Sequence, residues 1–378
     1  MDFTSLSRFI DRITAWRIPW AEVLVMHRNE LVFHYRNGYA DLERQTPISD
    51  RQIINIYSMT KIITCTAALQ LLERGAILLS DPISAYLPEF AEMTVRKTMP
   101  DGSVVEERAE KPITVRDLFA MTAGFSYDIG APSIREAVQR TDGKLPTREL
   151  ARAIAKVPLE FEPGTRWNYS MCHDVLAALV EVVDGRRFSS YVRDEITGPL
   201  GMRDTAFDLT GEQHQRLVPQ YKYDDKLGKA VREDGNGFRI GTELESGGAG
   251  LFSTVDDYVL FLNALTNKGT SPDGVRILSQ ASVDLMRADQ LTESTRGDFN
   301  WEHMAGYGYG LGVRTHISKA GSGSLSGLGE FGWAGAAGCL AVMDPESELT
   351  IMYAQHLLNS QEPYVHPRLR NIVYACLA

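Results

Sequence analysis

The strongest constraint on the fold is the position of the strand-like segments, which lie near both ends of the sequence. Near the N-terminus, apolar runs at 23–26 and 31–35 flank a polar turn at 28–30. Near the C-terminus, runs at 338–343 and 349–354 flank a second turn. Each pair is typical of a β-hairpin. We therefore expect one antiparallel sheet that both ends of the chain complete.

The residues between the hairpins are dominated by helical patterns. Apolar residues recur at helical spacing in segments 116–121, 148–156, 175–183 and 191–196. Helices inserted between two halves of one sheet predict an α/β plus all-α fold with two lobes. We expect a discontinuous α/β lobe of residues 1–60 and 236–378 and a mainly helical lobe of residues 61–235. The active site is expected between the lobes.

Two local patterns add detail near the N-terminus. Residues 6–16 predict an amphipathic helix that covers the sheet. The apolar face of this helix consists of Phe9, Ile10, Ile13 and Trp16. Asn37 and Gly38 form a pair that is typical of a turn, so we expect the chain to reverse there.

Composition excludes several classes of protein. Of 378 residues, 44% are hydrophobic and 23% are charged, as in ordinary globular enzymes. The formal net charge of −10 disfavours nucleic acid and anionic membranes as partners, because both attract basic proteins. None of the cysteines has C-x-x-C spacing, so we expect free and mostly buried thiols in a reducing compartment. These cysteines are Cys65, Cys172, Cys339 and Cys376.

The sequence predicts a cytoplasmic protein. Residues 1–6 lack a basic stretch followed by an apolar core, so they do not resemble a signal peptide. No run reaches about 18 apolar residues, the length that a membrane-spanning helix needs. The sequence does not indicate the oligomeric state.

Ser58 and Lys61 form an S-x-x-K pattern that predicts covalent catalysis. An extended run at 54–57 precedes Ser58, and helix formers follow at 62–74 before Gly75. The pattern therefore predicts that an amphipathic helix begins at Ser58, with Lys61 one turn away as a proton acceptor. Backbone N–H groups at such a helix start also favour an oxyanion. The alternative is a serine that caps the helix beside a solvated lysine.

Further segments, taken with this pattern, resemble the penicillin-recognising serine hydrolases, the superfamily of class C β-lactamases and D,D-peptidases. The segment 157–170 ends in Tyr169 and Ser170 just before a helical pattern, like the second motif of the superfamily. The glycine-rich segment 331–338 takes the place of the third motif. Segments 118–125 and 247–258 fit as well. The resemblance spans 54–353 and is closest to the family VIII carboxylesterases, which implies a β-lactamase-like fold.

The resemblance also implies roles for individual residues. Ser58 is expected to attack an acyl carbonyl, while Lys61 and Tyr169 act as general base and acid. Which of the two is the base stays open. The backbone N–H groups of Ser58 and Ala336 are expected to form the oxyanion hole. Water then releases the acyl group, so a small-molecule ester is the expected partner and no cofactor is expected.

Two positions depart from the β-lactamase pattern and bear on the substrate. Met171 stands where lactamases of this type have asparagine, so an amide that binds the substrate's acylamide is missing. Trp333 replaces a lysine or histidine, so a cation that pairs with a lactam carboxylate is missing. Both changes favour small to medium neutral esters. The expected substrate-binding residues are Trp333, Ala334, Gly335, Tyr127, Phe125 and Met171.

Several alternatives stay open at this point. A β-lactamase, a D,D-peptidase or an acyltransferase would use the same residues, and a non-catalytic sensor would keep the fold and form a stable acyl adduct. Other chemistries lack their motifs. No serine lies in G-x-S-x-G, and no H-E-x-x-H indicates a metal site. The segment 320–327 lacks the P-loop order and predicts a surface loop. His173, His316 and His356 are expected to be structural.

Overall fold

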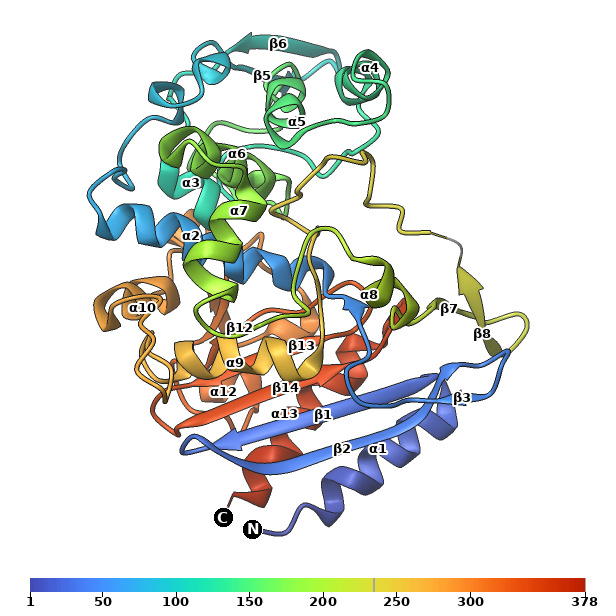
Figure 1. Cartoon of the computed structure of the whole chain (residues 1–378). Helices are drawn as coiled ribbons and strands as arrows, with labels where there is room; N and C mark the ends of the chain where they lie inside the picture. Colours follow the sequence, from blue (N-terminus) through green and yellow to red (C-terminus); the bar gives the residue numbers. More distant parts are fainter. Residues whose placement is uncertain (234, 378) are drawn as a thin grey trace.

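The computed structural model describes residues 1–233 and 235–377. Its centre is an eight-stranded antiparallel sheet in the order β10-β11-β12-β13-β14-β1-β2-β3 (Figure 1). β1 and β14 are neighbours, with Val23 opposite Tyr353, so the two ends of the chain complete one sheet as predicted. The strands of this sheet are β1 (Trp20–His27), β2 (Glu30–Asp41), β3 (Thr46–Pro47), β10 (Tyr307–Tyr309), β11 (Arg314–His316), β12 (Phe331–Gly332), β13 (Leu340–Asp344) and β14 (Leu349–Ala354).

Both predicted hairpins are confirmed, as β1–β2 and β13–β14. The turn expected at Asn37 and Gly38 is wrong, because β2 continues through both residues to Asp41. Gly38 has a φ of 98°, and a Cβ at this position would lie 2.2 Å from the carbonyl oxygen of Pro19. Glycine is needed here because two neighbouring strands approach closely, not because the chain reverses.

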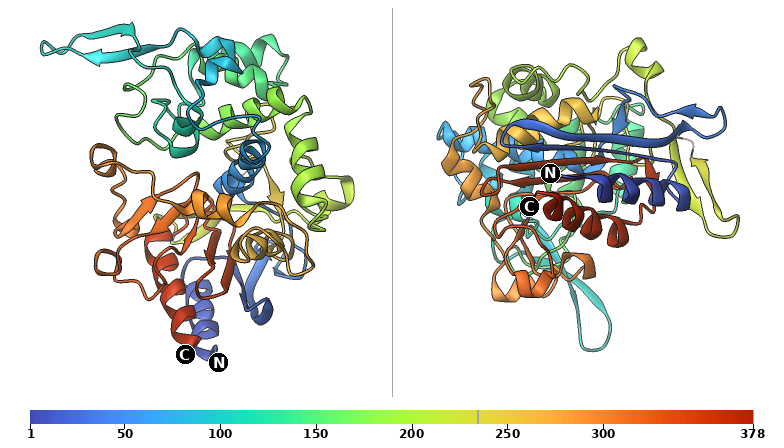
Figure 2. Two further views of the ribbon diagram at one scale, coloured as in Figure 1. Left: turned by 90° about the vertical axis from the view of Figure 1, so that its left-hand side faces the viewer. Right: turned by 90° about the horizontal axis from the view of Figure 1, so that it is seen from below.

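Helices cover both faces of the sheet. α1 (Thr4–Trp16) and α13 (Glu362–Cys376) lie side by side on one face, and α9 (Val255–Thr266) packs on the other (Figure 2). Buried on both faces, β14 is apolar along almost its whole length. The predicted N-terminal helix is confirmed, but Trp16 is 46% exposed, because it is the last residue of α1 and packs edge-on against Tyr364 near the surface.

α2 (Thr60–Glu73) runs through the middle of the molecule, where it packs against α6 (Cys172–Asp184) and α7 (Phe188–Val192) (Figure 1). The expectation that it is amphipathic is wrong. Its side chains are buried on all sides from Thr60 to Leu71, because α6 and α7 pack against it. The helices predicted between the hairpins are confirmed. These and their neighbours are α3 (Val115–Ala120), α4 (Pro132–Arg140), α5 (Thr147–Ile154), α6 (Cys172–Asp184), α7 (Phe188–Val192), the π-helical turn η4 (Arg193–Thr197) and α8 (Gly211–Gln215).

Strands also occur where only helices were predicted. β5 (Thr94–Thr98) and β6 (Val104–Arg108) form a hairpin, and β7 (Gln220–Asp224) pairs with β8 (Lys229–Glu233) and with β15 (Leu357–Leu358). The remaining elements are β4 (Ile54–Asn55), β9 (Phe252–Ser253), α10 (Gln280–Arg287), α11 (Glu293–Arg296), α12 (Lys319–Ser322), η1 (Tyr57–Met59), η2 (Ile83–Ala85), η3 (Pro88–Phe90) and η5 (Glu302–Met304). β7 thus joins a strand from the C-terminal part of the chain. The division into lobes at residues 60 and 235 stays a prediction, and Ala378, its last residue, lies outside the described residues.

Two further expectations concern the whole chain. All cysteines are free and buried, as predicted. Among the helices of the described ranges, none combines the length and the apolar character needed to cross a membrane. The cytoplasmic location stays a prediction.

Candidate active site

Ser58 lies on a tight turn between a short strand and α2. β4 leads into the 3-10 turn η1, which contains Tyr57 and Ser58 and continues into α2. Tyr57 has a φ of 46°, a left-handed conformation that is rare for a bulky residue and is found at functional turns. The turn is fixed from behind, because the Tyr57 hydroxyl donates to Gln220 Oε1 at 2.8 Å. The Ser58 side chain is therefore presented from a rigid turn.

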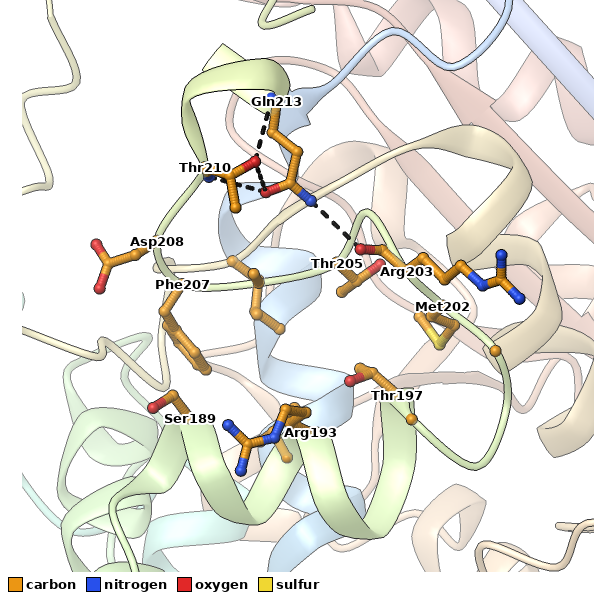
Figure 3. Close-up of a pocket in the computed structure, with 15 residues that line it drawn as sticks. Ser189, Arg193, Thr197, Met202, Arg203, Thr205, Phe207, Asp208, Thr210 and Gln213 are labelled. Atoms are coloured by element: carbon orange, nitrogen blue, oxygen red, sulfur yellow. Dashed lines mark hydrogen bonds between the residues drawn. The ribbon is translucent and has the colours of Figure 1, made fainter.

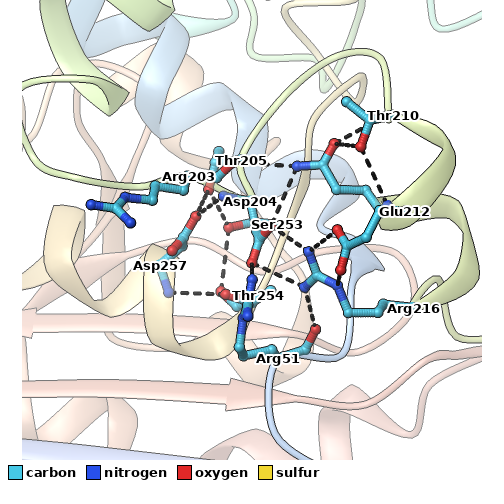
Figure 4. Close-up of polar contacts among 11 residues, drawn as sticks. Arg51, Arg203, Asp204, Thr205, Thr210, Glu212, Arg216, Ser253, Thr254 and Asp257 are labelled. Carbon is cyan, nitrogen blue, oxygen red and sulfur yellow. Dashed lines mark hydrogen bonds and ion pairs between the residues drawn. The ribbon is translucent and has the colours of Figure 1, made fainter.

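The segment that leads to β4 is anchored by an ion-pair network (Figure 4). Arg216 donates to both carboxylate oxygens of Asp204, at 2.5 and 2.9 Å, and Arg51 donates to Oδ2 at 3.1 Å. The hydrogen bonds from Arg216 lower the pKa of Asp204 to about 2. The backbone N–H of Ile53 donates to the carbonyl of Arg216 at 3.0 Å. Asp204 thus ties two parts of the chain together just before the turn that carries Ser58.

Lys61 is buried beside Ser58. Its side chain is 0% exposed, so the alternative of a solvated lysine is wrong. Nζ lies 3.5 Å from Ser58 Oγ and donates to the carbonyl oxygen of Gly248 at 2.8 Å. Gly248 has no room for a side chain, since a Cβ there would lie 2.6 Å from Asp174 Oδ2. A glycine at 248 therefore lets a carbonyl and a carboxylate approach the same ammonium group.

The surroundings of Lys61 favour its charged form. Burial by itself lowers the pKa of Lys61, but Tyr127, Tyr169 and Asp174 together raise it above its ordinary value. Nζ lies 5.4 Å from the ring centre of Tyr127 and 4.7 Å from that of Tyr169, so both rings offer their negative faces to the cation. Burial raises the pKa of Asp174, which accepts hydrogen bonds from Ser246 and Gly248. We conclude that Lys61 is an ammonium ion at neutral pH.

Tyr169 lies between two other aromatic rings. It stacks on Tyr127 with ring centres 5.5 Å apart and on Trp333 with ring centres 5.6 Å apart. Trp333 Nε1 donates to the Tyr169 hydroxyl oxygen at 3.3 Å. A donor aimed at this oxygen stabilises negative charge on it. The structure therefore gives Trp333 a polar contact that its sequence position did not reveal.

A pocket of about 220 Å³ opens above Ser58. Its lining residues are Tyr57, Ser58, Tyr127, Tyr169, Phe238, Ala249 and Ala336. Ala336 reaches this pocket because β12 leads directly to it, and Gly335 packs so closely that a Cβ would lie 2.4 Å from the carbonyl oxygen of Ile56. The three sequence motifs thus meet at one cavity. Ser58 comes from the turn before α2, Tyr169 from the loop before α6, and Ala336 from the segment after β12.

Comparison with known proteins is consistent with this arrangement. The family model described as "Beta-lactamase" matches residues 6–376.

The chain belongs to the beta-lactamase family.

Within this family, Protein Rv1367c of Mycobacterium tuberculosis H37Rv is 34% identical over 342 residues, covering 88% of this chain and 84% of the relative. Esterase EstB of Burkholderia gladioli is 29% identical and covers 89% of this chain and 85% of the relative. The solved structure of EstCE1, described as "a hydrolase with promiscuous acyltransferase activity", has a TM-score of 0.79 at 24% identity, covering 98% and 99% of the two chains. The chain is a penicillin-recognising serine hydrolase near the family VIII esterases. It is therefore an enzyme of the serine hydrolase type on a beta-lactamase fold.

Some of the predicted substrate-binding residues lie outside the lining of this pocket. Phe125 is buried and packs against Phe90 with ring centres 5.6 Å apart. Met171 is buried at the start of α6. Trp333 touches Tyr169 but is itself buried, and Ala334 pairs with Leu340 of β13. These residues do not line the pocket, whereas Tyr127 does.

The histidines have structural partners. His173 is buried and lies 3.3 Å from the carbonyl oxygen of Phe119. Burial lowers the pKa of His173 to about 3, so it is neutral. His316 contacts Gly327 and Ser322, and His356 contacts the carbonyl oxygen of Pro219. The prediction that these histidines are structural agrees with these contacts.

Sequence reasoning missed several residues of the site. Asp174 lies five positions after Tyr169, and this spacing across the start of a helix was the available signal. Phe238 carried no signal, because it lies in an irregular segment and reaches the pocket only through the fold. Trp301 was also missed. Its ring centre lies 5.7 Å from that of Tyr169 and 6.0 Å from that of Trp333, so it belongs to the same aromatic cluster.

A second cavity of about 640 Å³ lies between α7, η4 and the loop before α8 (Figure 3). Thr197, Phe207 and Leu251 are among its lining residues. The segment 249–251 separates the two cavities, because Ala249 lines the Ser58 pocket whereas Leu251 lines this one. Among the described residues that line this second cavity, Ser58 is absent. The role expected for Ser58 therefore does not depend on this cavity.

Proposed function

We propose that this chain is a carboxylesterase that cleaves small to medium esters through an acyl-enzyme on Ser58. The observation that carries the proposal is the meeting of Ser58 and Tyr169 at one small, mainly aromatic pocket, with the Lys61 ammonium buried beside both. The name of the relative EstB supports ester chemistry.

In this proposal Tyr169 is the general base. The raised pKa of Lys61 disfavours a neutral amine, so in this proposal Lys61 stays an ammonium and the Tyr169 oxygen takes the proton of Ser58. Lys61 and the Trp333 N–H both lie beside Tyr169, where they favour negative charge on its oxygen. The sequence left the choice between Lys61 and Tyr169 open, and Tyr169 is the base that we propose.

Acylation then proceeds in balanced steps. Ser58 Oγ forms a bond to the ester carbonyl carbon while its proton moves to the Tyr169 oxygen. The negative charge that develops on the carbonyl oxygen is held by the backbone N–H groups of Ser58 and Ala336, both of which line the pocket. The bond to the alcohol breaks, and Tyr169 returns the proton to the leaving alkoxide. Water repeats the sequence on the acyl-enzyme and releases the carboxylic acid.

The preference for neutral esters rests on Trp333 and on the pocket lining. A lysine at position 333 would provide a cation for a substrate carboxylate, whereas Trp333 uses its only donor on Tyr169. Met171 is buried and carries no amide for an acylamide group. Phe238 and Tyr127 add aromatic walls that suit an acyl chain. Losing a charge-assisted hydrogen bond, about 1.5 to 3 kcal/mol, corresponds to one to two decades in lactam turnover.

Acyl transfer to an alcohol is the second candidate. The description of EstCE1 names a promiscuous acyltransferase activity, and the same Ser58 adduct would serve if an alcohol replaced water. β-Lactamase or D,D-peptidase activity is the remaining alternative on this scaffold.

One substrate panel tests these assignments. We expect wild type to hydrolyse p-nitrophenyl butyrate with a larger kcat/KM than nitrocefin or a D-Ala-D-Ala peptide, and Ser58→Ala to lose all of this turnover. Product analysis with added alcohol would reveal a transferase, and intact-mass spectrometry would reveal an adduct that accumulates without turnover. A larger kcat/KM for nitrocefin, or ester hydrolysis that persists in Ser58→Ala, would overturn the proposal.

A further inference from the structure

Arg370 on α13 is a buried cation that the reaction does not use. It is 3% exposed, and among the described residues its side chain makes no hydrogen bond and no ion pair. Its Nε is fully buried without a partner. The guanidinium instead lies over the ring of Tyr307, 5.2 Å from the ring centre. Buried arginines are almost always paired, so this one calls for an explanation.

The carboxylate of Glu330, whose charge acts on Arg370, is already engaged. Arg314, which is 0% exposed, donates to Glu330 Oε1 at 2.7 Å. The hydroxyl of Tyr307 donates to Glu330 Oε2 at 2.9 Å. Both oxygens of Glu330 therefore have donors, and Arg370 donates to neither oxygen. Burial, followed by the charge of Arg314, lowers the pKa of Arg370 from its ordinary value, which reflects the uncompensated charge.

A second acid nearby does not supply a full counter-charge. Glu362 lies at the start of α13, and burial raises its pKa to about 7. A carboxyl group with this pKa is about half protonated at neutral pH. Glu302, on the turn η5, is an exposed carboxylate. Among the described residues, neither acid forms an ion pair with Arg370.

Arg370 faces a cavity of about 280 Å³ between α13, the turn η5 and the end of α12. Polar side chains surround this cavity with Arg370. They are Glu302, His303, Ser322, Ser324 and Asn371. Ser324 Oγ already contacts Ser326 and Asn371, and Ser322 Oγ contacts His316, so these hydroxyls are held in place. Burial lowers the pKa of His303, which therefore enters the cavity wall as a neutral imidazole.

We propose that this cavity binds a small oxyanion, a carboxylate or phosphate group, with Arg370 as its main ligand. A guanidinium offers parallel N–H groups that match such a group in a bidentate way. The cavity volume is ample for an anion of a few heavy atoms. The anion completes the missing partner of a charge that the fold buries, and Ser324 lies in the same cavity wall.

This site is connected to the catalytic aromatic cluster. His303 stacks on Trp301 with ring centres 6.2 Å apart and planes 3° apart. Trp301 in turn lies against Tyr169 and Trp333. An anion held between Arg370 and His303 therefore contacts the segment that positions the ring beside Tyr169. A change in ester turnover on binding is a secondary consequence and rests on the proposed function, whereas binding itself does not.

The test measures binding directly. Calorimetry and thermal unfolding are run with inorganic phosphate and with butyrate at constant ionic strength, using wild type, Arg370→Met and Arg368→Met. Arg368 is the matched control, because it lies on the same helix but is exposed and donates to the carbonyl oxygen of Tyr364. We expect saturable binding in wild type and Arg368→Met, and at least about a tenfold loss of affinity in Arg370→Met.

The two anions distinguish the source of the ligand. Tighter binding of butyrate identifies a carboxylate site, and tighter binding of phosphate identifies a phosphate site. Ser324→Leu, which fills the cavity and leaves the arginine, is expected to weaken binding as well and serves if Arg370→Met does not fold. Absence of saturable binding in wild type, or equal affinity in wild type and in these variants, would overturn the proposal whether or not the protein hydrolyses esters.

Discussion

Lys61 and Arg370 are both buried cations, but their surroundings differ. Lys61 has a carbonyl oxygen at 2.8 Å, two aromatic faces and a nearby carboxylate. Arg370 has one aromatic face and no hydrogen-bond partner among the described residues. The first environment raises the pKa of its cation, and the second lowers it. The comparison indicates that a fold can bury a charge either by surrounding it with its own groups or by leaving a place for a ligand.

The largest expected effect concerns Lys61. Replacing it in Lys61→Met removes the cation that stabilises negative charge on Tyr169, so we expect kcat for p-nitrophenyl butyrate to fall about 10²- to 10⁴-fold. Steady-state kinetics measure the change, with Ser58→Ala as the background and circular dichroism to verify the fold. A fall in kcat of less than about tenfold would mean that the charge of Lys61 does not support catalysis.

Asp204 is a buried charge that has its full set of arginine partners, so its titration should affect stability. Its pKa is lowered from 3.8 to about 2 by Arg216, so its stabilising contribution is full above pH about 4 and is lost as the pH falls toward about 2. We expect the free energy of unfolding to lose about 2 kcal/mol across this range through Asp204 alone. Urea titrations of wild type and Asp204→Asn measure the difference. The two pH profiles should converge at the acid end, and parallel profiles would contradict the assignment.

Trp333 tests the polar contact to Tyr169. Trp333→Phe keeps an aromatic ring but removes the Nε1 donor, so we expect kcat to fall about tenfold with little change in KM. Trp301→Phe is the matched control, because Trp301 contacts Tyr169 only through its ring. Equal effects of the two substitutions would mean that ring packing, not the hydrogen bond, matters at position 333.

The smallest expected effect concerns the stability of Arg370→Met. Removing an uncompensated buried charge should leave the free energy of unfolding unchanged or raise it by about 1 kcal/mol in the absence of added anion. Arg368→Met is expected to stay within about 0.5 kcal/mol of wild type. Urea unfolding in a buffer without carboxylate or phosphate checks both. A loss of more than about 2 kcal/mol in Arg370→Met would mean that groups of the protein itself stabilise the charge of Arg370. Arg370 would then resemble Lys61 and would not need a ligand.

Much of the fold followed from local patterns. The two hairpins were predicted because alternating apolar runs and turn residues are short-range signals, and both are present in the structure. Gly38 was misjudged because glycine serves both in turns and where strands approach closely, and only the approach of Pro19 distinguishes the two. The burial of α2 was missed because a helix surrounded by other elements shows no polar face.

The candidate site divides in the same way. Ser58, Lys61 and Tyr169 were identified from motif order, and the structure places Ser58 and Tyr169 in the wall of one pocket with Lys61 beside both. Phe125 was expected near the substrate, but it packs against Phe90, because the residues that follow a motif are placed by core packing rather than by the motif. The roles of these residues stay predictions until the variants are measured.

The sequence by itself determined the family and the paired hairpins and predicted Ser58 as the nucleophile, because these depend on residue types at fixed spacings along the chain. Only the tertiary structure decided which groups surround the buried charges. Asp174 and Gly248 reach Lys61, Trp333 donates to Tyr169, and Arg370 faces a cavity without a counter-ion among its described neighbours. The physical reason is that electrostatic interactions depend on distance and burial in space, which segments far apart in the sequence establish only when they pack together.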